Sequence, residues 1–319
     1  MARLGLRTVC ESKVLKQTTL WGCNHFLRKF QLWAEAEREP VTKDRLETLL
    51  LDYMDILLQD KQAVYNIEKT IAAAVASTLG VSRRSMGRLN RALTGYRKAI
   101  PPRSRLPIPD ELCAALAAVL KAMDFHETAL MTVLGQDGYF RPGEMRDLCV
   151  SDLVAPPGGL DPATKFWSII VAPEERLEAS KTQTFDDTVV LDSRPWLGPL
   201  LRQQCLGKLP HHLVFSVSAT DMVAQWKAAC LKLGVPGLVM YQLRHGGASS
   251  DMLSRRRGAA DVMLRGRWRS LSSLRRYAKP GQLAKLLNDL TPPVRAFSLR
   301  AHCQLQKALE GKVLLRLPV

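Results

Sequence analysis

Hydrophobic residues recur every three to four positions through most of the chain, and this spacing predicts α-helices. In the first hundred residues the stretches 46–57 and 64–75 show it most clearly, and the second is expected to end at Gly80. We therefore expect a compact α-helical domain there. Beyond it, Asp110 is a suitable N-cap, and helices are predicted over residues 112–123, 127–134 (stopped by Gly135 and Gly138), 221–233, 241–253, 260–264 and 301–309.

Two short runs of β-prone residues interrupt this pattern, at 166–172 and 188–191. They predict a small β-sheet with an exposed turn that contains Lys181. Between residues 99 and 109, four prolines prevent a continuous helix and favour an extended connector. The connector marks the expected domain boundary.

The predicted fold class is therefore mainly α with a small β-sheet, in two domains. We expect an α-helical domain at 1–100, a connector at 101–109, a mixed but mainly helical domain at 110–290 and a tail at 291–319. The tail packs either on its own domain or on a neighbouring subunit.

Charge adds an expected partner. The chain carries 46 Lys and Arg against 30 Asp and Glu, a formal net charge of +16, and this excess favours a polyanionic partner, nucleic acid before membrane. Seven scattered cysteines without a Cys-x-x-Cys pair argue against a disulfide framework or a zinc site, and adjacent His211 and His212 are expected to lie in a polar loop. Without an apolar leader or spanning segment, we expect a soluble, intracellular protein with no membrane partner.

Tyr277 stands in the most basic part of the chain. Between Arg255 and Lys279 there are nine Lys and Arg residues and a single acid, Asp261. A phenol in such a field is suited to attack on a phosphodiester, because the surrounding cations favour its ionised form. Duplex DNA is therefore the expected substrate.

Other motifs carry the groups that this chemistry needs. Arg141 precedes Glu144 by three residues at an expected helix start, and Arg244 stands beside His245. Two planar guanidinium groups can neutralise and orient the non-bridging oxygens of a phosphate. Lys181 can protonate the leaving oxygen if its pKa is brought closer to the working pH. No metal or other cofactor is required.

These motifs, in this order, resemble the tyrosine recombinases, or phage-type integrases. Arg141 with Glu144 is similar to the family's arginine box, and Lys181 is similar to its β-hairpin lysine. The sequence Tyr-Gln-Leu-Arg-His at 241–245 resembles its His-x-x-Arg-His box, with tyrosine in place of the first histidine. Trp268 precedes Tyr277 by nine residues, as in the family. The resemblance implies the catalytic set Arg141, Lys181, Tyr241, Arg244, Trp268 and Tyr277, supported by Glu144 and His245.

The resemblance also implies an activity: site-specific DNA recombination or integration through a 3′-phosphotyrosyl intermediate, by a homotetramer on paired sites. Its location would be at DNA, in the nucleus if the source is eukaryotic, and the residues around Tyr277 look closest to recombinases of eukaryotic mobile elements. The helical first domain would clasp the DNA. Backbone phosphates are expected to contact Arg255, Arg256, Arg257, Arg267, Arg269, Arg275 and Arg276.

Other functions stay open, and Tyr241 is the reason for the first of them. Histidine shuttles protons near neutral pH, whereas a neutral phenol is mainly a hydrogen-bond donor. The chain could thus be an inactive, DNA-binding remnant of a recombinase. A type IB topoisomerase uses a similar residue set to relax supercoils, and a helical scaffold or RNA-binding protein would show no preference for duplex DNA.

Overall fold

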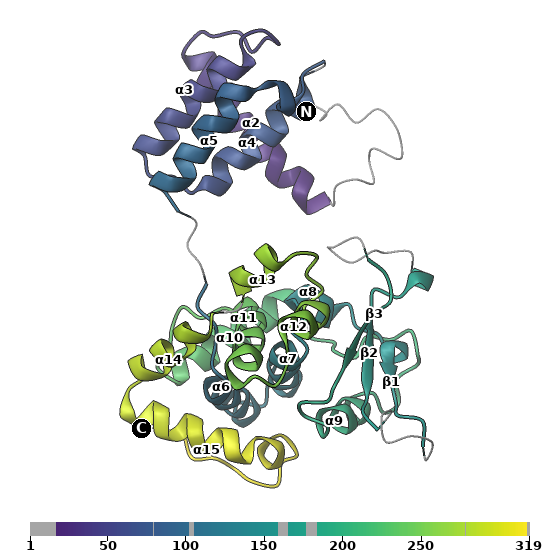
Figure 1. The fold of residues 1–319 in the computed structure, drawn as a ribbon. Coiled ribbons are helices and arrows are strands. Elements are labelled where there is room, and N and C mark those ends of the chain that lie inside the picture. Colours follow the sequence, from purple (N-terminus) through teal and green to yellow (C-terminus); the bar gives the residue numbers. More distant parts are fainter. Residues whose placement is uncertain are drawn as a thin grey trace. The chain divides into compact units, whose positions relative to one another are not determined.

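The computed structural model describes residues 17–78, 80–101, 105–158, 165–176, 184–277 and 279–317. The chain folds into two units, residues 1–103 and 104–319 (Figure 1). Helices dominate both units, and the described strands form one small sheet in the second unit. This confirms the predicted fold class, mainly α with a small β-sheet. Among the described residues no helix is both long enough and apolar enough to span a bilayer.

The first unit is built from helices that bury one face each. Phe30, Leu50, Ile67 and Ile71 are fully buried in its core. The last helix of the unit contributes few core residues and is otherwise polar and basic. The helices described in this unit are α2 (Gln17–Ala36), α3 (Leu46–Gln59), α4 (Val64–Ser77) and α5 (Gly87–Ala99).

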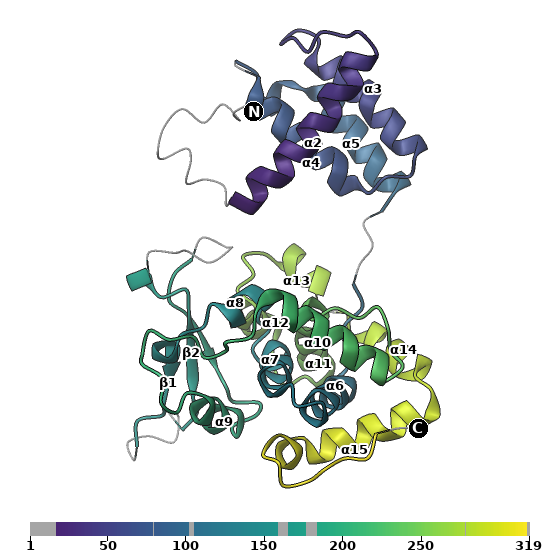
Figure 2. The ribbon, with the colours of Figure 1, turned by 180° about the vertical axis from the view of Figure 1, so that it is seen from behind.

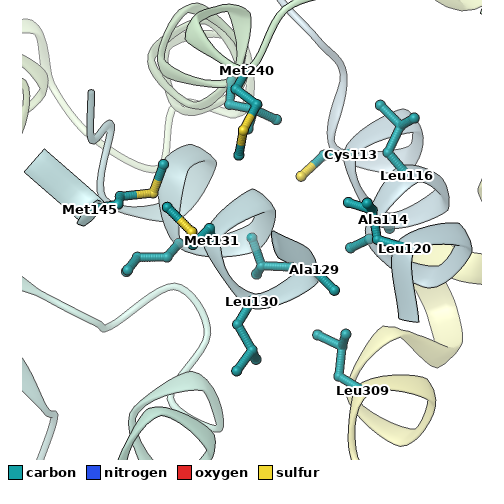
Figure 3. Packing of buried hydrophobic residues seen from close by; sticks show 14 of the residues in the cluster. Cys113, Ala114, Leu116, Leu120, Ala129, Leu130, Met131, Met145, Met240 and Leu309 are labelled. Atoms are coloured by element: carbon teal, nitrogen blue, oxygen red, sulfur yellow. The ribbon is translucent and has the colours of Figure 1, made fainter. Parts of the chain in front are cut away.

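The second unit is organised around α6 (Asp110–Ala122), in which all residues from Leu112 to Leu120 are buried. Helix α7 (His126–Asp137) packs against it, and Figure 3 shows their side chains meeting. The C-terminal helix α15 (Pro292–Leu309) lies along α6 (Figure 2) and buries Phe297 and Ala301 completely. The tail therefore packs on its own unit.

The sheet has the order β1-β2-β3 and is antiparallel, with Ile169 opposite Val189. These two residues are buried and join the core of the second unit. The strands are β1 (Leu153–Val154), β2 (Ser168–Val171) and β3 (Asp187–Val190). The sequence predicted β2 and β3, whereas β1 is only two residues long and gives no periodic signal.

Short helices gather around α11 (Tyr241–Ser254), which contacts α7, α12, α13 and α14. Two glycines of α11 permit close packing: a Cβ on Gly246 would meet the Ile108 carbonyl oxygen at 2.1 Å, and one on Gly247 would meet that of Gln136 at 2.0 Å. Helix α11 is thereby held closely by its neighbours. The remaining helices of the unit are α8 (Pro142–Arg146), α9 (Leu197–Gln204), α10 (Ala219–Lys232), α12 (Ala259–Arg265), α13 (Leu271–Tyr277) and α14 (Pro280–Asp289).

Four predicted helix boundaries were wrong. Helix α4 ends at Ser77, three residues before Gly80. Pro109 is the N-cap of α6, and Asp110 is its first residue, with a carboxylate that accepts a hydrogen bond from Gln136. Helix α7 continues through Gly135, where the missing side chain leaves room for Met145, and ends at Asp137. Helix α15 begins at Pro292, nine residues before the predicted start, because proline fits the first turn of a helix.

Candidate active site

Tyr277 is the last residue of α13 and is half-buried. Its ring stacks on Trp268, with centroids 4.6 Å apart, and contacts the ring of His245 at 4.5 Å. Its hydroxyl shares a hydrogen bond of 2.8 Å with the hydroxyl of Tyr241, the first residue of α11. Three side chains therefore fix the phenol at the N-terminal end of α11.

Arg244 lies beneath this aromatic group and is completely buried. Its terminal nitrogens donate to the carbonyl oxygens of Tyr139 and Gly266, and its guanidinium carbon lies 4.8 Å from the Trp268 ring and 5.4 Å from the Tyr277 ring. Its Nε is buried and has no hydrogen-bond partner among the described residues. A Cβ on Gly266 would meet the Trp268 ring at 2.2 Å. Glycine at this position therefore lets the Gly266 carbonyl lie within hydrogen-bonding distance of Arg244.

Glu144 joins two further arginines to the site. Its carboxylate accepts the Arg141 backbone N–H at 2.8 Å, as expected for the third residue of a capped helix, and it pairs with the Arg141 guanidinium. Arg267 donates to the same carboxylate at 2.7 Å. Burial opposes ionisation of Glu144, but the charges of Arg267, Arg141 and Arg244 outweigh it and hold the pKa of Glu144 below its usual value.

The site therefore holds three guanidinium groups around one carboxylate. Burial, and then the charges of Arg141 and Arg267, lower the pKa of Arg244 to about 9, which leaves it protonated at neutral pH. An incoming anion would relieve this repulsion. The arrangement is suited to binding a phosphate.

Tyr241 and His245 are both uncharged near neutral pH. Burial and the hydrogen bond to Tyr277 raise the pKa of Tyr241, so its phenol keeps its proton. Burial, followed by the charges of Lys279, Arg105 and Arg244, lowers the pKa of His245 to about 4. Neither residue adds positive charge to the site at pH 7, and Tyr241 acts on Tyr277 as a hydrogen-bonding group.

Two of the arginines expected to contact DNA are engaged with acidic residues of the chain itself. Arg267 is only 6% exposed and is committed to Glu144, so it supports the site from inside. Arg257 is half-buried and pairs with Asp251 and Asp192. Arg256 is exposed but lies 3.3 Å from Asp251. The other four predicted DNA-contacting arginines are exposed and have no acidic partner among the described residues: Arg255, Arg269, Arg275 and Arg276.

The structure brings together Arg141, Tyr241, Arg244, Trp268 and Tyr277, with Glu144 and His245 beside them. The remaining predicted catalytic residue, Lys181, falls in 177–183, outside the described residues. Its place in the site therefore stays a prediction.

Sequence reasoning missed two cations near the aromatic group. Arg105 places its guanidinium carbon 5.0 Å from the ring centroid of Tyr241, and nothing in the connector sequence signals this contact. Lys279 has a buried Nζ without a hydrogen-bond partner among the described residues, and burial lowers its pKa. The sequence feature that could have indicated Lys279 is its position in the basic run, two residues after Tyr277.

No family model matches the chain, and no curated protein matches it in sequence. Solved structures do resemble it, and two of them are described as recombinases. One is XerA recombinase, at 16% identity over 84% of this chain and 99% of that chain, with a TM-score of 0.39. The other is XerH site-specific recombinase bound to palindromic difH substrate in a post-cleavage complex, at 12% identity over 85% of this chain and 77% of that chain, with a TM-score of 0.53. The likeness to XerH shows that the chain has the fold of the tyrosine recombinases.

Proposed function

We propose that the chain breaks and rejoins DNA strands through a covalent bond between Tyr277 and phosphate, and that it thereby carries out site-specific recombination. The observation that carries this proposal is the position of the Tyr277 phenol. It stacks on Trp268 beside the buried guanidinium of Arg244, in a cluster where three arginines face one carboxylate. The proposed nucleophile and the proposed phosphate-binding group therefore stand side by side.

In the proposed reaction, the Tyr277 oxygen attacks phosphorus and loses its proton to water. The bond from phosphorus to the 5′ oxygen breaks, which leaves a 3′-phosphotyrosine and a 5′ hydroxyl. Arg141 and Arg244 bind the non-bridging oxygens, whose negative charge grows in the transition state. Lys181 protonates the departing 5′ oxygen. Attack on the phosphotyrosine by another 5′ hydroxyl reverses the step, so strands exchange without ATP.

The proposed partner is duplex DNA, bound by a homotetramer on paired sites. Arg255, Arg269, Arg275 and Arg276 are exposed near Tyr277 in the sequence and would contact backbone phosphates, which position a duplex without reading its sequence. The XerH structure supports this partner, because that protein is described with its DNA substrate.

An inactive clamp is the second candidate, and Tyr241 favours it, since the hydroxyl needed for attack is engaged by a phenol instead of a histidine. Such a protein would bind duplex DNA strongly and form no covalent bond. Tyr277→Phe would leave its behaviour unchanged.

Covalent trapping tests the proposal. The protein is incubated with a library of nicked duplexes that lose the 5′-hydroxyl fragment after cleavage, and denaturing gels reveal adducts. We expect an adduct with the wild type and none with Tyr277→Phe, whereas Tyr65→Phe, which changes an exposed tyrosine of the first unit, should retain it. Strong duplex binding without any adduct identifies the inactive clamp. Relaxation of supercoiled plasmid without paired sites would identify a topoisomerase instead.

A further inference from the structure

Two helices meet beside Tyr277, and their ends need hydrogen-bond partners. Helix α13 ends at Tyr277, and Lys279 is the N-cap of α14. Carbonyl groups at the end of a helix and N–H groups at its start have no partner within the helix. The Ser249 hydroxyl satisfies one of each: it donates to the Tyr277 carbonyl at 3.0 Å and accepts the Lys279 backbone N–H at 2.7 Å.

Ser249 belongs to the same helix as the phosphate-binding arginine. It is completely buried in α11, one turn beyond His245 and five residues beyond Arg244. With a rise of about 1.5 Å per residue, roughly 7.5 Å along the helix axis separate the Arg244 and Ser249 backbones. A single rigid element therefore carries Arg244 and the group that holds the backbone of Tyr277.

Helix α11 is a firm support for this contact. Gly246 and Gly247 bring it against the Ile108 and Gln136 carbonyls, at distances that exclude any side chain. The other contacts of Tyr277 involve its ring and hydroxyl, through Trp268, His245 and Tyr241, whereas Ser249 acts on its backbone. Ser249 is therefore a side-chain contact to the main chain at the proposed nucleophile, next to the hydrogen bond between His245 and the backbone of Arg276.

We propose that Ser249 is a positioning residue, which holds the main chain of Tyr277 in register with Arg244 of the same chain. This inference rests on the proposed function for its effect on chemistry. A displacement of about 1 Å at a reacting group can lower a rate by roughly a hundredfold. Loss of the Ser249 hydroxyl leaves the Tyr277 carbonyl and the Lys279 N–H without their shared partner, so the segment between α13 and α14 is freed to shift.

The first test needs no activity. Hydrogen–deuterium exchange is measured over residues 271–290 in the wild type, in Ser249→Ala and in Ser250→Ala. Ser250 is the neighbour on the same helix, and no hydrogen bond links it to that segment among the described residues. We expect faster exchange there in Ser249→Ala only. Exchange at the wild-type rate in Ser249→Ala overturns the inference.

The second test separates the nucleophile from the phosphate site. Cleavage of nicked duplexes requires Tyr277, whereas ligation of a DNA end bearing a 3′-p-nitrophenyl phosphate to a 5′ hydroxyl uses the arginines and bypasses the tyrosine. We expect Ser249→Ala to slow cleavage by roughly ten- to a hundredfold and to leave this ligation near the wild-type rate. Equal loss of both reactions overturns the positioning role, because it indicates general damage to the site.

The two tests also keep the two proposals apart. A wild type that neither cleaves nor ligates contradicts the proposed function. Hydrogen exchange then still decides by itself whether Ser249 holds the segment.

Discussion

Replacing Tyr241 with phenylalanine removes the hydroxyl that contacts the hydroxyl of Tyr277, at 2.8 Å, and keeps the ring, which lies edge-on to His245 and within 5.0 Å of the Arg105 guanidinium carbon. Because burial and this hydrogen bond raise the pKa of Tyr241, its phenol should stay protonated in the proposed reaction, while Tyr277 loses a proton to attack phosphorus. In the transition state Tyr241 therefore donates to an oxygen that is gaining negative charge. We expect Tyr241→Phe to slow cleavage.

The size of the effect follows from the difference between two hydrogen bonds. A bond between two neutral phenols contributes about 1 kcal/mol, and a bond to a charged oxygen about 1.5–3 kcal/mol. Only the difference, about 0.5–2 kcal/mol, accelerates the chemical step. At about 1.4 kcal/mol for each factor of ten, the expected loss is roughly 2- to 30-fold.

The assay is single-turnover cleavage of a nicked duplex at saturating protein, with Tyr65→Phe as the matched control. The same variants are compared for duplex binding, which should not change, because Tyr241 acts on the nucleophile. Cleavage by Tyr241→Phe as fast as the wild type, or faster, would refute the reasoning. It would mean that Tyr241 merely occupies the Tyr277 hydroxyl before DNA arrives.

Other predictions follow from the charges around the site. Glu144→Gln should lower the unfolding free energy by about 3 kcal/mol at pH 7, since it leaves buried arginines unpaired. Because the pKa of Glu144 is depressed in the folded chain, this difference should be present above pH of about 4.3 and shrink as the pH falls further, which melting curves with Glu174→Gln as control can check. Arg269→Met should weaken duplex binding and reduce the salt dependence of binding by about one phosphate contact, with the melting temperature unchanged. Arg267→Met changes a buried arginine and should lower the melting temperature. Mixing Tyr277→Phe with Arg244→Ala protein should restore no cleavage, because Tyr277 lies over Arg244 of its own chain; recovery would show that tyrosines are exchanged between chains.

Local patterns explain which parts of the fold could be predicted. Helices α6, α10 and α11 repeat apolar residues over several turns, and the two longer strands are rich in β-branched residues, so their type follows from the sequence. Boundaries depend on neighbours that the sequence does not identify. Gly135 was expected to stop α7, yet in the fold it makes room for Met145 on α8.

In the candidate site, too, contacts within one turn follow from the sequence, whereas contacts between distant segments do not. The sequence placed Arg141 and Glu144 three residues apart at an expected helix start, and in the fold both belong to a single capped turn in which their side chains pair. The burial of Arg267 and the contact of Arg105 with Tyr241 depend on how distant segments pack. Ser249 has no motif of its own, and its role emerges only where α13 and α14 meet α11.

The stack of Trp268 on Tyr277 makes the proposed nucleophile accessible to optical spectroscopy. Indole emission is sensitive to the groups in contact with the ring, and the phenol must change its surroundings when it attacks phosphorus. The chain has six tryptophans, so a variant that keeps only Trp268 would convert movement of Tyr277 into a change of fluorescence. Nucleophile motion could then be timed directly, without an added dye.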